Sequence, residues 1–145
     1  MTISTTIIKN SYSGNGSTTA FTYNFKITAE TEIQVIVKTN ATGAESVRSI
    51  GTGSTNYAVS GVGNNSGTVT FVTAPLSTET VLLRRSTAQT QAMDLIDNDP
   101  MSADTIETAH DKSIAISQEL QEQLDRSLKI SRANTMTSTE FTNSA

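Results

Sequence analysis

The chain has no cysteine and no tryptophan, and only two of its 145 residues are proline. Without cysteine there can be no disulfide, no thiolate nucleophile and no thiolate metal ligand. No stretch approaches the roughly 20 apolar residues that a membrane-spanning helix needs. The first ten residues also lack the basic leader and apolar core of a signal peptide. We therefore expect no membrane insertion and no cleaved signal.

Charge is scarce and unevenly distributed. Only 17% of the residues are charged, and the formal net charge is −4. Residues 1–92 hold six Lys or Arg against four acids, whereas residues 93–145 hold four against ten. Nucleic-acid binding needs a concentrated basic face, and the only adjacent basic residues are Arg84 and Arg85. We expect no nucleic-acid partner.

The first two thirds of the chain alternate polar and apolar residues. Phe21, Tyr23 and Phe25 are separated by polar residues, and the segment 33–37 repeats the pattern with Ile and Val. This period of two predicts half-buried strands, and the 25 Thr suit such surfaces. The Gly- and Asn-rich segment 61–67 reads as a hairpin turn. Turn signals recur roughly every 8–12 residues, which predicts an antiparallel β-sandwich or barrel-like domain over residues 1–95.

The last third has a helical period. Ser102 is placed as an N-cap, and neither Gly nor Pro occurs from Ala103 to about Ile130. We predict a long helix within residues 96–131, followed by a polar tail over 132–145. Along this helix one narrow apolar stripe, called here the helix seam, consists of Ile106, Ala109, Ser113, Ile116, Leu120, Leu124 and Leu128.

A narrow seam on a polar rod is typical of a helix that associates with copies of itself. The alternative is that the seam packs on the β domain of its own chain, and we favour self-association. The mean seam spacing of about 3.67 residues predicts a bundle that is nearly straight or slightly right-handed.

Few residues suggest chemistry. The single histidine, His110, lacks convergent partners, and we place it at or beside the helix seam. Asp94, Asp97 and Asp99 lack the glycine and distant glutamate of a calcium loop, so a solvated turn is the better interpretation. No carboxylate pair or phosphate-binding loop is recognisable. We therefore expect no enzyme activity, no metal and no cofactor.

The two adjacent arginines close a predicted strand over 80–85. Because side chains alternate across a strand, Arg84 and Arg85 must point to opposite faces. One of them is a candidate for an ion pair within an assembly or for a docking contact.

Several blocks, taken in order, carry a resemblance to a known family. They are Ser11–Phe25, Thr55–Gly61, Gly67–Phe71, Ala74–Pro75, Val81–Arg85 and the helix Ala103–Leu128. Together they resemble the N-terminal domain of podovirus tail fibres of the T-seven type and span about residues 11–130. The chain departs from that pattern just before the helix, where Leu95, Ile96 and Met101 replace the usual aromatic residue.

The resemblance implies a homotrimer whose helices form a coiled-coil-like bundle. It also implies a location in the virion, where the domain docks between tail adaptor and nozzle proteins while a longer region or a separate protein binds the host. The expected function is a structural anchor for a tail fibre or tailspike. The alternative is a carbohydrate-binding β module that contacts the host surface directly. That alternative requires exposed aromatic residues.

Overall fold

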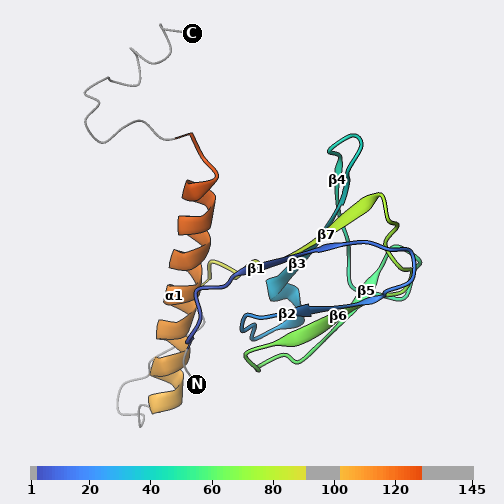
Figure 1. Cartoon of the computed structure of the whole chain (residues 1–145). Coiled ribbons are helices and arrows are strands. Elements are labelled where there is room, and N and C mark those ends of the chain that lie inside the picture. Colours follow the sequence, from blue (N-terminus) through green and yellow to red (C-terminus); the bar gives the residue numbers. More distant parts are fainter. Residues whose placement is uncertain (1–2, 91–101, 129–145) are drawn as a thin grey trace, which may run out of the picture.

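The computed structural model describes residues 3–90 and 102–128. Its elements are β1 (Lys9–Ser13), β2 (Ala20–Tyr23), η1 (Glu30–Glu32), β3 (Ile33–Thr39), β4 (Glu45–Val47), β5 (Tyr57–Ser60), β6 (Gly67–Phe71), β7 (Glu79–Arg85) and α1 (Ala103–Asp125). The strands form two antiparallel sheets, ordered β1-β7-β3-β4 and β2-β6-β5 (Figure 1). The mainly β fold with a C-terminal helix is confirmed, and the sheets do not close into a barrel.

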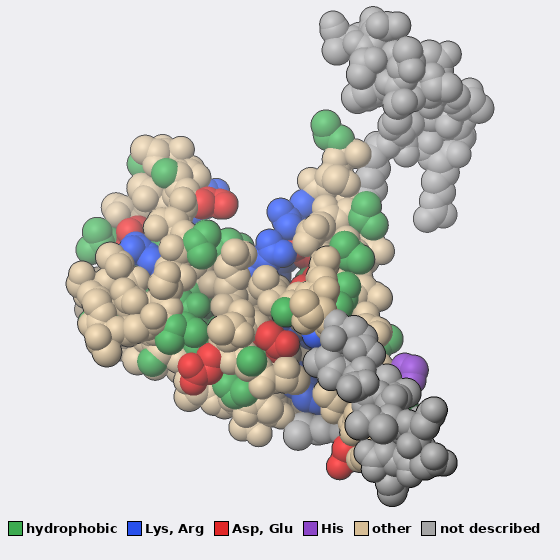
Figure 2. Space-filling view, turned by 180° about the vertical axis from the view of Figure 1, so that it is seen from behind, with side chains coloured by type: hydrophobic (Ala, Val, Ile, Leu, Met, Phe, Trp, Pro, Cys, Tyr) green, Lys and Arg blue, Asp and Glu red, His purple; other side chains and the backbone are tan. Residues whose placement is uncertain are grey.

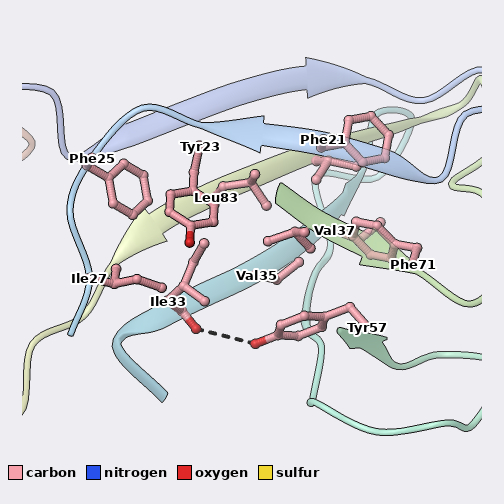
Figure 3. Packing of buried hydrophobic residues seen from close by; sticks show 12 residues of the cluster. Phe21, Tyr23, Phe25, Ile27, Ile33, Val35, Val37, Tyr57, Phe71 and Leu83 are labelled. Carbon is pink, nitrogen blue, oxygen red and sulfur yellow. Dashed lines mark hydrogen bonds between the residues drawn. The ribbon is translucent and has the colours of Figure 1, made fainter. Parts of the chain in front are cut away.

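The core lies between the two sheets and follows the alternation of the sequence. Phe21 and Tyr23 of β2 are buried, and Phe25 and Ile27 continue the same alternation beyond the strand. They meet inward-facing residues from both sheets, as Figure 3 shows: Ile33, Val35, Val37, Tyr57, Val69, Phe71, Val81 and Leu83. Burial of this apolar surface is the main contribution to the stability of the sandwich.

Two buried tyrosine hydroxyls make hydrogen bonds in the core, one between the two sheets and one between β2 and β5 of the same sheet. The Tyr57 hydroxyl donates a hydrogen bond to the Ile33 carbonyl (Figure 3), and the Tyr23 hydroxyl donates to the Ser60 carbonyl at 2.7 Å. Burial raises the pKa of both tyrosines. Their polar tips are thus satisfied inside an otherwise apolar core, which favours one arrangement of the sheets.

The helix α1 stands at one end of the sandwich, near the start of β1 (Figure 1). Ser102 occupies the N-cap position, but its side chain makes no capping hydrogen bond. The helix ends at Asp125, before the predicted bound at residue 131, and the polar tail predicted over 132–145 lies outside the described residues. Within the described ranges, no helix is long and apolar enough to span a membrane.

Candidate assembly interface

The last inward-facing residue of β7 is charged. Val81, Leu83 and Arg85 are all buried, because alternate residues of a strand share a face. The Arg85 side chain is therefore carried to the end of the core, where α1 lies across it. Arg84 points the other way and is half-buried, with Lys9 and Gln34 as its cross-strand neighbours.

Arg85 makes an ion pair with the helix. Its Nε atom donates to Glu119 Oε1 at 3.0 Å, and its Nη2 atom donates to the Ala115 carbonyl and to the Gln118 side chain. The exposed fraction is 1% for Arg85 and 7% for Glu119. Both charges are thus removed from water, and the partner of Arg85 lies on the helix of its own chain.

Thr87 completes the coordination of the Glu119 carboxylate. Its backbone N–H donates to both carboxylate oxygens, and its hydroxyl donates to Oε1 at 2.6 Å. A buried ion pair is tolerated only when such additional hydrogen bonds offset the desolvation of its charges. Geometry of this kind fixes the rotation and the axial position of the helix more than it adds net stability.

Weaker contacts flank this pair along the helix. Lys26 contacts Asp111 at 3.0 Å with both side chains largely buried, and Lys9 of β1 contacts Glu122 at 2.8 Å. The N-terminal segment lies beside α1, where the Ile3 N–H donates to Asp111 and Gln118 donates to the Thr5 carbonyl. The face of α1 that packs on the sandwich, called here the docking face, comprises Asp111, Ala115, Gln118, Glu119 and Glu122.

Glu122 titrates below the ordinary range. Burial acts to raise its pKa, but hydrogen bonds from Arg126 and Lys9 outweigh that effect and lower the pKa below 4.5. The Glu122 contribution to stability is therefore present at neutral pH and is lost as the pH falls through the lowered pKa.

The helix seam occupies a different face of α1. Its residues Ile106, Ala109 and Ile116 are half-buried, whereas Leu120, Leu124 and Leu128 are 47%, 55% and 96% exposed. Figure 2 shows hydrophobic side chains following one another along the helix. A groove of about 800 Å³ borders the seam, lined by four of its residues together with Gln89 and Thr90. Within the described residues, the seam is therefore largely uncovered from Leu120 to Leu128.

Other predicted residues do not gather into a site. His110 is exposed on α1. Asp94, Asp97 and Asp99 lie outside the described residues, as do Leu95, Ile96 and Met101 before the helix. Within residues 3–90 and 102–128, no cluster of three or more His, Asp or Glu could hold a metal ion.

The docking face was missed from the sequence, although a signal for it was present. The polar residues between the seam positions indicate only a polar rod, yet Glu119 is buried and Asp111 and Glu122 are largely covered. Acidic excess after residue 92 and basic excess before it predict an electrostatic contact between the two parts. Recognising a second stripe at helical spacing would have located that contact.

Replacing Glu119 with Gln should be far more costly than the same change at Glu122. The first leaves the Arg85 charge buried without a counter-charge, and we expect a loss of about 3–5 kcal/mol in the free energy of unfolding. Glu122→Gln alters a pair whose Lys9 side chain is 49% exposed, and should cost less than about 1 kcal/mol. Urea denaturation followed by circular dichroism measures both. Equal losses would contradict a special role for Arg85 and Glu119.

No protein-family model matches the chain. The chain is similar to the tail spike protein of Salmonella phage epsilon15, with 30% identity over 131 residues. The match covers 89% of this chain and 12% of that relative, so the chain spans only a small part of the length of the tail spike protein. The comparison therefore relates this chain to one segment of a phage tail spike protein.

Proposed function

We propose that the chain is a non-enzymatic virion module that anchors a tail fibre or tailspike to a phage tail, and that it assembles through the helix seam as a homotrimer. The observation that carries this proposal is the two-faced helix. One face is held on the β domain by buried polar contacts, and the other presents a continuous apolar stripe. Similarity to a tail spike protein supports the phage setting.

The seam has the properties of a self-association surface. Exposed leucines at helical spacing lose water contact when copies of the helix meet, which contributes on the order of 1 kcal/mol each. Ser113, the polar member of the seam, donates its hydroxyl to the Ala109 carbonyl of the same helix at 3.1 Å. It can therefore be buried in an interface without leaving an unpaired donor.

Helical geometry separates the two faces. At 100° per residue, the docking face lies roughly half a turn from the seam, on the opposite side of the helix. A bundle built on the seam therefore carries three β domains on its outside, each held by its own Arg85–Glu119 pair. Three domains presented by one bundle can bind a tail more strongly than one, because the second and third contacts become intramolecular.

The β domain offers a surface suited to docking at the end farthest from α1. Three loops, residues 14–19, 50–56 and 72–78 and called here the far loops, contain no charged residue. The Gly16 N–H donates to the Pro75 carbonyl, and the Val72 N–H donates to the Asn56 carbonyl, so the loops lie together. Val72 and Leu76 are 50% and 59% exposed. Such a surface favours an uncharged partner surface in the adaptor and nozzle region of the tail.

The distribution of aromatic residues disfavours direct sugar binding. In the described part of the chain every aromatic residue is buried except Tyr12, which is half-buried. The Tyr12 ring packs on Phe21 with ring centres 5.5 Å apart, and its hydroxyl donates to the Thr22 carbonyl. An aromatic platform for stacking a sugar ring is therefore missing among these residues.

Removing the apolar character of the seam should abolish assembly. We expect the native chain to have the molar mass of a trimer by light scattering, and the variant with Leu120, Leu124 and Leu128 changed to Ser to be a monomer with an intact β domain. Ile114 is 49% exposed on α1 but lies off the seam, so Ile114→Ser is the matched control and should remain trimeric. A monomeric native chain would refute the trimer.

Docking should depend on the far loops. We expect the trimer to bind phage tails assembled without it, and Leu76→Asp to weaken that binding at least about tenfold while the trimer persists. Val47→Asp, at an equally exposed valine of β4, is the control and should bind normally. Because the far loops carry no charge, native binding should change little with salt. Strong weakening by salt, or normal binding of Leu76→Asp, would place docking elsewhere.

A further inference from the structure

A small pocket lies between the sandwich and α1, beneath the Arg85–Glu119 pair. Its volume is about 220 Å³. Basic and hydroxyl side chains converge on it from separate parts of the chain, among them Lys26, Thr28, Arg85, Thr87, Thr108 and Lys112. The pocket is distinct from the helix seam and from the far loops, so its chemistry is independent of the proposed function.

The Arg85 guanidinium has unused donors at this pocket. A guanidinium carries five N–H groups, and the edge formed by Nε and Nη2 is turned to Glu119, Ala115 and Gln118. Nη1 lies on the opposite edge, is buried, and has no hydrogen-bond partner. Two donors of a fully charged group are thus left without an acceptor, an arrangement that proteins rarely tolerate.

The pocket is lined by three basic side chains and two acidic ones, so its lining carries one excess positive charge. Lys112 also lines the pocket, and its ammonium group donates to the carbonyl and the hydroxyl of Thr90. The two acids at the pocket are already engaged: Asp111 accepts from Lys26 and from the Ile3 N–H, and Glu32 accepts from the N–H and the hydroxyl of Thr28. Neither carboxylate accepts a hydrogen bond from Arg85 Nη1.

We propose that this pocket binds a small tetrahedral oxyanion, sulfate or phosphate. The anion accepts from Arg85 Nη1 and from the Lys112 ammonium group, and threonine hydroxyls supply further donors. It bridges the end of β7 and the helix, because Arg85 belongs to one and Lys112 to the other. Occupancy therefore strengthens the attachment of α1 to the β domain.

Titration with sulfate tests the proposal on the full chain, with chloride used to hold the ionic strength constant. The side-chain N–H signals of Arg85 should shift and saturate in the millimolar range in ¹H–¹⁵N spectra. Lys112→Gln should weaken this binding about tenfold, since it removes one of two cationic contacts. Lys38→Gln makes the same charge change at an exposed lysine of β3 outside the pocket and should leave the affinity unchanged.

Three results would overturn the proposal. Arg85 signals that do not move with sulfate mean that water satisfies Nη1. A shift that fails to saturate, or that is equal in Lys112→Gln and the native chain, means an adventitious ion only. Phosphate run in parallel should give the same pattern as sulfate, and a response to neither anion excludes an oxyanion site.

Discussion

The buried pair between Arg85 and Glu119 determines how the two parts of the chain are joined. Arg85 occupies the last inward-facing position of β7, where an apolar residue would be usual. Because its charge is buried there, it requires a counter-charge. Only a helix that brings a carboxylate to this point can cover it. The pair therefore selects one rotation of α1, and that rotation turns the helix seam outward. A purely apolar contact would be as stable and less selective.

The docking face and the helix seam of α1 make different kinds of contact. Charge-assisted hydrogen bonds hold the docking face within one chain, where effective concentration is high and a precise fit is possible. The seam offers apolar area, which gains stability from any complementary apolar surface and suits contact between identical copies. Because the faces differ, assembly of the helices need not compete with attachment of the β domain. The proposed trimer can thus be built as three complete units around one bundle.

The sequence predicted the elements that bury apolar residues at a regular period. Alternation located the core strands, and the absence of Gly and Pro located the helix. It did not predict β1, whose KNSYS sequence has one large ring, or β4, whose three residues are all exposed. These edge strands are held by hydrogen bonds to β7 and β3 and carry little hydrophobic signal. Glu119 was missed for a related reason, since a buried carboxylate is recognised only through the partner that the fold brings to it.

The orientation of the helix is tested most directly by cross-linking, because the chain has no cysteine of its own. Ser113→Cys places a thiol on the seam, and Ile114→Cys places one about 100° away on the same helix turn. Under mild oxidation we expect disulfide-linked pairs of chains for Ser113→Cys and unlinked chains for Ile114→Cys. Efficient linkage through position 114, with none through 113, would show that another face of α1 meets its copies and would contradict the account.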